Sequence, residues 1–270
     1  MTVALQVIGL TLLLLAAQAV LRHAGKWVVW GLFAALPVVL LPHWIATAQL
    51  DLFMWVKIAS VIFCIAWGTA VRFTRLGERE WARRSAPVLV AVNILEAVAV
   101  DLADGRLTHL LNATAGLVLV LTLPYHRGGV RVDDTRRCRD VRVPTSRGWV
   151  VGYTLWNWAF VLLNYPSLAG YHTAVLTAAL MVGLIDPARW TQTRAATLGM
   201  ILFATATFVT PTRAWLDTSG WSDSWLAPAA AWSAVAVGVG CGVAKVLANG
   251  RRPHPQLQPA WGNGVLTVCG

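Results

Sequence analysis

Two carboxylic acid side chains lie inside long apolar stretches of the sequence, where an ionisable group is costly unless it serves a purpose. Glu96 and Asp101 both fall in the apolar run from residue 86 to 103. A carboxyl group held away from bulk water can donate a proton to an alkene or an epoxide, so both are candidate catalytic acids. Lys57, in the run from 51 to 72, leaves the choice between them open. If its ammonium group contacts Glu96, that group stays a carboxylate and Asp101 becomes the better acid.

Amide, aromatic and cationic side chains accompany the two acids. With alternating helix directions and a rise of about 1.5 Å per residue, most of them fall in one layer in the outer half of the membrane. Tyr153, Asn157 and Asn164 are spaced four and seven residues apart, which places them on one helix face. The sequence therefore predicts an outward-opening polar pocket, with these candidate substrate-binding residues: Lys57, Asn93, Asn112, Tyr153, Trp156, Asn157, Asn164 and His172.

A purely structural interpretation of the same residues stays open. Asparagines in membrane helices often serve only as interhelical hydrogen bonds, each worth about 1 kcal/mol or less. A pair of Lys57 and Glu96 at equal depth could likewise only hold two helices together. The clustering of many polar groups at one depth favours a functional pocket.

The elements that must position these residues are apolar helices of membrane-spanning length. The chain has 270 residues, of which 57% are hydrophobic and 13% charged. A span needs roughly 20 apolar residues, and the sequence supplies such runs repeatedly. We predict an all-α, polytopic membrane helix bundle over residues 1–248, followed by a disordered cytoplasmic tail at 249–270. About nine transmembrane helices are expected, near residues 3–22, 27–47, 51–72, 86–103, 107–124, 149–166, 170–186, 195–211 and 225–247.

The distribution of basic residues indicates the orientation. All but three of the 22 Lys and Arg residues fall in the odd-numbered connections or at the C-terminal end. The positive-inside rule then puts the N-terminus outside and the C-terminus inside, in a multi-pass protein of the cell membrane. The first run could alternatively be a signal peptide, because Ala17-Gln18-Ala19 resembles a cleavage site. It lacks a preceding basic segment and is long enough to span, so we expect a helix.

Charge and cysteine usage exclude several other classes. The net charge of +10 does not indicate a nucleic-acid partner, because the arginines lie in short connections between apolar runs. The largest connection, residues 125–147, is rich in arginine, and we interpret it as a topology signal that also meets anionic lipid headgroups. No metal site, disulfide framework or cofactor is expected, because the sequence has no Walker A, HExxH or GxSxG motif and its cysteines are scattered: Cys64, Cys138, Cys241 and Cys269.

The sequence contains 15 tryptophans, and most have a simple explanation. They lie near the ends of the expected spans, where aromatic belts form. Trp67, Trp156, Trp158 and Trp232 lie deeper. Beside a polar pocket, such rings could stabilise a cation through their π faces.

Several short motifs occur in a fixed order: Trp55-Val56-Lys57, then Asn93-Ile94-Leu95-Glu96-Ala97, then Asn112 ahead of a run containing Gly116, then Leu155-Trp156-Asn157. Together they resemble a group of bacterial polytopic membrane proteins known only as a domain of unknown function. The resemblance covers roughly residues 50–205, with the basic connection as a departure, and it implies no activity. In design, though not in any motif, the chain is also similar to integral-membrane terpene cyclases, which use intramembrane carboxyl groups as acids.

Three functions are compatible with these features. The first is an integral membrane enzyme acting on a hydrophobic isoprenoid or terpenoid substrate, in which Glu96 or Asp101 starts a cyclisation by protonation. The alternative is a transporter of a small polar or charged solute through the same Lys, Glu and Asn pocket, with Asp186 and Arg194 as a second gate or a surface pair. The third is a sensor or assembly protein whose polar residues only join helices. The expected partners are a hydrophobic or amphipathic small molecule and membrane lipids.

Overall fold

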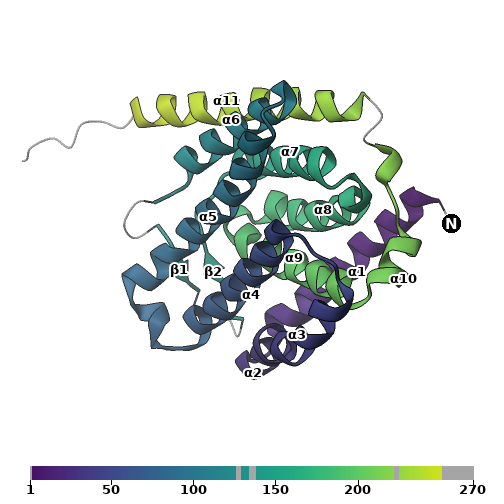
Figure 1. The fold of residues 1–270 in the computed structure, drawn as a ribbon. Helices are drawn as coiled ribbons and strands as arrows, with labels where there is room; N and C mark the ends of the chain where they lie inside the picture. The colour runs from purple at the N-terminus through teal and green to yellow at the C-terminus, as the bar shows by residue number, and fades with distance from the viewer. Residues whose placement is uncertain (1, 126–128, 134–137, 222–224, 251–270) are drawn as a thin grey trace, which may run out of the picture.

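The computed structural model describes residues 2–125, 129–133, 138–221 and 225–250 (Figure 1). Most residues in these ranges are helical, and the described strands form one antiparallel hairpin. The elements are α1 Val3–His23, α2 Lys26–Trp30, η1 Gly31–Ala35, α3 Leu36–Thr47, α4 Leu52–Phe73, η2 Arg75–Glu78, α5 Glu80–Asp104, α6 Leu107–Thr122, β1 Arg131–Val132, β2 Val141–Arg142, α7 Arg147–Asn164, η3 Pro166–Leu168, α8 Ala169–Ile185, η4 Pro187–Arg189, α9 Trp190–Thr207, α10 Val209–Trp215, η5 Ser219–Trp221 and α11 Leu226–Gly250.

Every predicted apolar run contains a helix, so the prediction of an all-α bundle is confirmed. The second run contains a π-helical turn, η1, just before Pro37, whose missing N–H cannot continue the regular ladder. The expected helix at 195–211 has different limits. It begins at Trp190 and ends at Thr207, and α10 follows after a bend of 111°. The predicted tail lies outside the described residues from 251 onward.

Five helices are long and apolar enough to cross a membrane: Val3–His23, Lys26–Thr47, Leu52–Phe73, Glu80–Asp104 and Pro166–Ile185. A sixth is added if Pro187–Thr207 and Val209–Trp215 count as one bent span. Leu107–Thr122 and Pro228–Val243 are apolar but shorter. The nine spans and their orientation therefore stay predictions.

Two buried cores meet at α8 in the middle of the bundle (Figure 1). Leu176 and Ala179 of α8 pack with α5, α6, α7 and α11, whereas its Ala174 and Ala178 pack with α1, α4 and α9. α11 lies across α6 and α7 on one side, at the top of the view, and α2 and α3 lie on the opposite side. The boundary between the two cores is where polar side chains can gather without facing lipid.

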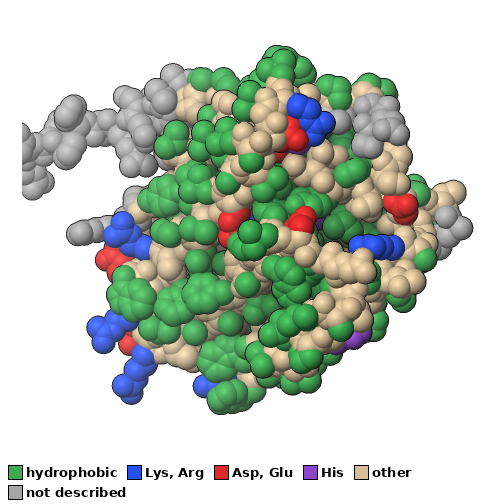
Figure 2. Space-filling model, viewed as in Figure 1, with side chains coloured by type: hydrophobic (Ala, Val, Ile, Leu, Met, Phe, Trp, Pro, Cys, Tyr) green, Lys and Arg blue, Asp and Glu red, His purple; other side chains and the backbone are tan. Residues whose placement is uncertain are grey.

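The surface of the bundle suits a lipid environment. Hydrophobic side chains cover much of the face shown in Figure 2, and Lys and Arg gather at its left-hand edge. The exposed apolar residues come from several helices and include Leu12, Val20, Val38, Val39, Leu121 and Ile185. Soluble monomers rarely expose contiguous apolar patches of more than a few hundred Å², so this surface fits burial in a membrane.

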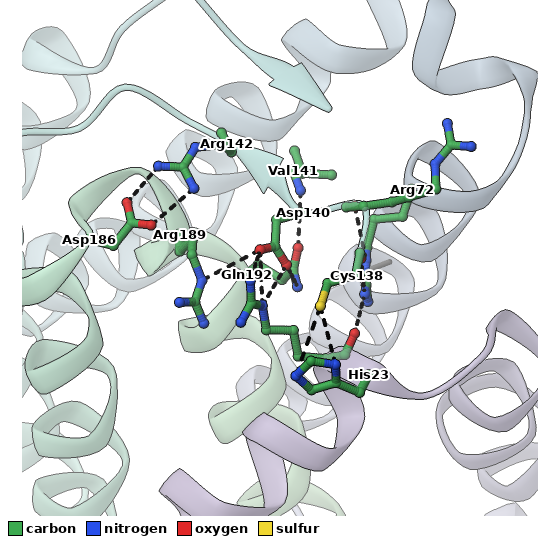
Figure 3. Close-up of polar contacts among 11 residues, drawn as sticks. His23, Arg72, Cys138, Asp140, Val141, Arg142, Asp186, Arg189 and Gln192 are labelled. Carbon is green, nitrogen blue, oxygen red and sulfur yellow. Dashed lines mark hydrogen bonds and ion pairs between the residues drawn. The ribbon is translucent and has the colours of Figure 1, made fainter. Parts of the chain in front are cut away.

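The described part of the basic connection folds back onto one end of the bundle, where α1 and α4 end and α9 begins (Figure 3). We call this region the basic end and define it by Arg22, Arg72, Arg142 and Arg189. Asp140, which is fully buried, accepts from Arg22 Nε at 3.0 Å and from Arg22 Nη2 at 2.6 Å. Arg72 Nη2 donates to the carbonyls of Arg22 and Cys138, each at 2.7 Å.

The hairpin is fixed by a second ion pair as well. Both guanidinium ends of Arg142 bind the carboxylate of Asp186, at 2.8 and 3.0 Å (Figure 3). The described part of the basic connection is thus a folded element that closes one end of the bundle. The sequence predicts only a signal for topology and lipid here, because the partners of Asp140 and Arg142 lie 118 and 44 residues away along the chain.

Asp140 gives the basic end a pH dependence. Burial alone would raise the pKa of Asp140, but the hydrogen bonds and charge of Arg22 outweigh it and hold the pKa below its usual value. Because the folded pKa lies below the unfolded value of about 3.9, the ion pair stabilises the fold fully above that pH. This stabilisation is lost as the pH falls through the lower, folded pKa.

The variant Asp140→Asn is expected to release the hairpin at neutral pH. Hydrogen bonds to charged groups contribute about 1.5–3 kcal/mol, so trypsin should cleave after the exposed Arg131 at least about tenfold faster. The matched control is Glu78→Gln, an exposed carboxylate near the same end. Equal cleavage rates in the two variants would show that the ion pair does not hold the hairpin.

Candidate functional site

Lys57 and Glu96 form a direct ion pair, as the pairing hypothesis requires. Lys57 Nζ donates to Glu96 Oε2 at 2.7 Å and to the carbonyl of Asn93 at 3.2 Å. The side chains are only 11% and 15% exposed. Lys57 Nζ also lies 5.3 Å from the centre of the Phe53 ring. The Glu96 carboxylate is thus engaged by the Lys57 ammonium group, which weakens the case for Glu96 as a proton donor.

Asp101 lies in a separate cluster, five residues further along α5 than Glu96. Its Oδ2 accepts from Asn112 at 2.7 Å, and its Oδ1 accepts from Asn164 at 2.9 Å and from His109 Nδ1 at 3.0 Å. Arg106 Nη2 lies 2.8 Å from His109 Nε2. Arginine can only donate, so Nε2 accepts and the imidazole proton is on Nδ1, facing Asp101. Three donors thus converge on one buried carboxylate.

His109 is a member of this cluster that sequence analysis missed. It is fully buried, and it faces Asp101 because α5 and α6 are joined by a tight turn at Gly105, where φ is +76°. The signal available in the sequence was the Asp-Gly turn between two apolar runs, which brings their adjoining ends together. None of Asp101, His109, Asn112 and Asn164 lines either of the two cavities described below. The cluster therefore joins α5, α6 and α7.

The variant Asp101→Asn tests this structural role. The new amide would direct a donor at Asn112, Asn164 or His109, and an unsatisfied buried donor costs about 1–3 kcal/mol. We expect a lower midpoint of thermal unfolding in detergent. Asp104→Asn, at a 28% exposed carboxylate on the same helix, is the matched control and should change the midpoint less. Equal midpoints for Asp101→Asn and the parent would contradict this role.

A smaller cavity of about 40 Å³ lies between α4, α5, α7, α8 and α9, towards the end opposite the basic end. Four of the predicted substrate-binding residues line it: Lys57, Asn93, Asn157 and His172. The others lie elsewhere. Tyr153 lines a second cavity, Asn112 and Asn164 bind Asp101, and Trp156 is fully buried with Nε1 donating to the carbonyl of Asn112 at 3.0 Å. The residues of the predicted single layer are thus divided between the two cavities, the Asp101 cluster and the core.

Arg194 completes the lining. The sequence predicts it near the inner face of the membrane, with Asp186, as a second gate or a surface pair, and the surface pair is wrong. Because α9 begins at Trp190, Arg194 lies in its second turn and is 5% exposed, and Asp186 instead binds Arg142. Arg194 Nη2 donates to Asn157 Oδ1 at 2.8 Å and lies 3.5 Å from His172 Nε2.

The rest of the Arg194 guanidinium is unsatisfied. Among the described residues, no partner within hydrogen-bond distance is found for Nε or Nη1, and both atoms are buried. Three of the five N–H donors of an arginine belong to these two nitrogens. The Tyr153 ring centre is 5.8 Å from Arg194 Cζ and supplies only a weak cation–π contact. A buried charge with free donors is costly, so it marks Arg194 as the centre of the candidate site.

A larger cavity of about 150 Å³ extends from Arg194 towards the basic end. Its lining is mostly apolar and includes Val61, Ile65 and Leu198, whereas Arg22, Arg72 and Arg189 line it at the basic end. The two cavities share Asn93, Arg194 and Leu198. Neither lining includes an aspartate or a glutamate from the part of the chain that the structure describes. The two cavities therefore meet at Arg194.

The described residues offer no group of three or more His, Cys, Asp or Glu side chains that could hold a metal ion.

No curated protein and no solved structure matches the chain. Residues 1–126 match the model of a family of unknown function, DUF5692. The match fits the resemblance to an uncharacterised family. The matched range covers the positions of Lys57, Asn93–Ala97 and Asn112 and ends before Leu155-Trp156-Asn157, so the motifs themselves stay a prediction. The comparisons therefore give this chain a similarity over its N-terminal 126 residues to a family of unknown function.

Proposed function

We propose that the protein is a multi-pass transporter of the cell membrane that carries a small charged solute through a site formed by Lys57, Asn93, Asn157, His172 and Arg194. The observation that supports this best is the sharing of Arg194 by two cavities. One extends towards the basic end and the other towards the opposite end. A binding group that can be reached in turn from two sides is what alternating access requires.

Irregular helices next to the site support the same proposal. Secondary transporters commonly bind their solute at interrupted helices, whose movement changes the accessible side. The π-helical segment η1 contributes Phe33 to the larger cavity. α9, which carries Arg194, ends in a bend of 111° three residues after Thr205 of the smaller cavity. Both interruptions are at positions where a change in helix geometry would alter a cavity.

Uptake by proteoliposomes tests the proposal. Three labelled probes of similar size differ in charge: benzenesulfonate, benzenesulfonamide and benzyltrimethylammonium. Benzenesulfonate is suited to the test because it stays ionised and cannot cross the bilayer as a neutral acid. We expect the parent protein to take up a charged probe faster than protein-free liposomes do.

The variant Thr205→Trp should block this uptake by filling the smaller cavity. Thr205 and Thr114 both donate to the carbonyl four residues earlier, at 2.9 and 2.8 Å, so Thr114→Trp on the exposed side of α6 is the matched control. The control should transport like the parent. A well-folded parent protein that takes up none of the three probes would reject the transporter.

An integral membrane enzyme acting on an isoprenoid substrate is the second candidate. The aromatic side chains of Tyr153 and Trp190 line the larger cavity, where they could stabilise a carbocation. The structure gives less support for an acid that could start the cyclisation. Glu96 is paired with Lys57, and the carboxylate of Asp101 accepts from three donors. Membranes with the parent, Glu96→Gln or Asp101→Asn protein would be given polyprenyl compounds and their epoxides. An isomer of unchanged mass that one variant fails to make would establish the enzyme and name its acid.

A further inference from the structure

We infer that the solute is a small organic anion, with a carboxylate or similar group that binds Arg194 and a compact apolar body that fills the larger cavity. This inference rests on the proposed binding site. It concerns the class of ligand, and a measurement of binding tests it separately from transport.

The charges around the junction favour an anion. Lys57, His172 and Arg194 line the smaller cavity, and the charge of Lys57 is neutralised by Glu96. Arg194 Nη2 contacts Asn157 and His172, and neither is acidic. Since arginine does not lose its proton in proteins, one positive charge at the junction has no acidic partner among the described residues. An anionic ligand would supply the missing charge.

The geometry of Arg194 favours a carboxylate in particular. A guanidinium group and a carboxylate are both planar, and two parallel N–H···O bonds join them. Nη1 is unpartnered within the described ranges, so one carboxylate oxygen can accept from it directly. The second oxygen can accept from Nη2 in place of Asn157 Oδ1, which holds that nitrogen at 2.8 Å. Asn157 is then the group that the ligand displaces.

The larger cavity favours a compact apolar body. Its lining beside Arg194 includes Val61, Ile65, Tyr153, Trp190 and Leu198. A cavity of about 150 Å³ is large enough for benzene, a body of about six carbons. Arg22, Arg72 and Arg189 line the same space at the basic end. Asp140 pairs with Arg22 and lies 3.6 Å from Arg189, whereas Arg72 donates to two carbonyls, so this end keeps a net positive charge that attracts anions.

Calorimetric titration of the full-length protein in detergent micelles tests the inference with benzoate as the probe. Benzamide, benzylammonium and inorganic phosphate serve as comparisons for charge and for the apolar body. We expect benzoate to bind and Arg194→Gln to weaken it by at least about tenfold, because hydrogen bonds to charged groups contribute that much or more. Arg213→Gln, at an exposed arginine outside both cavities, is the matched control and should bind like the parent.

Arg194→Lys provides a second variant should Arg194→Gln fail to fold. It keeps the charge and loses the planar pair of donors, so benzoate should bind to it more weakly than to the parent.

A series of straight-chain carboxylates shows whether the ligand is a small free acid or a membrane fatty acid. Affinity should rise until the chain reaches about six carbons and should fall beyond that length.

Several results would overturn the inference: benzamide or benzylammonium binding as tightly as benzoate, phosphate binding as tightly, affinity still rising for long fatty acids, or unchanged benzoate binding in both Arg194 variants.

The binding and uptake experiments can contradict the anion site and the transporter proposal independently of each other. Benzoate binding without uptake of any probe would reject transport and keep the anion site. Uptake of the cationic or the neutral probe without benzoate binding would reject the anion and keep transport.

Discussion

Replacement of Arg194 by methionine is expected to stabilise the folded protein while it abolishes uptake of benzenesulfonate. The guanidinium of Arg194 is buried with Nε and Nη1 unsatisfied in the described part of the chain. Replacing a buried ionic group by an apolar side chain of similar volume is often neutral or stabilises by about 1–4 kcal/mol. Asn157 and His172 line a cavity, so water can satisfy them once the arginine is gone. Thermal unfolding in detergent and proteoliposome uptake measure the two effects.

The combination of higher stability and lost activity is the informative outcome, because functional sites commonly retain groups that destabilise the fold. Arg213→Met, at an exposed arginine, is the control and should change neither quantity. A large loss of stability in Arg194→Met would mean that the arginine mainly joins α7 to α9. The candidate site would then lose its central residue.

Lys57→Met is expected to destabilise the protein strongly, and a second substitution, Glu96→Gln, is expected to restore most of the stability. Removal of one partner of a buried ion pair costs about 3–5 kcal/mol, because the other charge is left uncompensated. Glu96 is 15% exposed and, besides Lys57, accepts only from Ser60 Oγ at 3.3 Å among the described residues. In the double variant no charge remains, and the free energy of unfolding should return to within about 1 kcal/mol of the parent.

The folded double variant also shows what the pair does besides holding α4 to α5. Lys57 lines the smaller cavity, so its loss should slow anion uptake even when stability is restored. Glu78→Gln, an exposed carboxylate, is the control for the loss of a negative charge. Parental uptake by a stable double variant would assign the pair a purely structural role. A double variant as unstable as Lys57→Met would contradict the pairing.

The sequence predicted the helices well because their signal is local. Long apolar runs interrupted by proline and polar connections identify each helix without knowledge of its neighbours. The pair of Lys57 and Glu96 followed from equal depth on consecutive helices, and it is present. Depth in the membrane could not show that Glu96 and Asp101 have different environments, so both were candidate acids. Their environments differ because Asp101 lies beside the turn that brings His109 and Asn112 back to it.

The sequence places Arg194 outside its helix for a physical reason. Basic residues close to an apolar run normally belong to its polar end, and counting them gives the topology. Whether such a residue is inside or outside depends on where the helix starts, and this boundary is the least certain feature of a sequence-based prediction. The start of α9 at Trp190 moves Arg194 into the bundle, one turn from the helix end. The two cavities depend on packing between helices distant in sequence, which no local pattern specifies.

Labelling of a single cysteine from both sides of the membrane tests the central claim, that a solute reaches the Arg194 junction from two ends. Asn93 lines both cavities, so Asn93→Cys would be introduced into a protein whose native cysteines, Cys64, Cys138, Cys241 and Cys269, are replaced by serine. Oriented vesicles would then be treated from either side with a sulfonated or a trimethylammonium methanethiosulfonate, neither of which crosses membranes. We predict modification from both sides, faster with the anionic reagent and slowed by benzoate. Modification from one side only, or faster modification by the cation, would contradict the account.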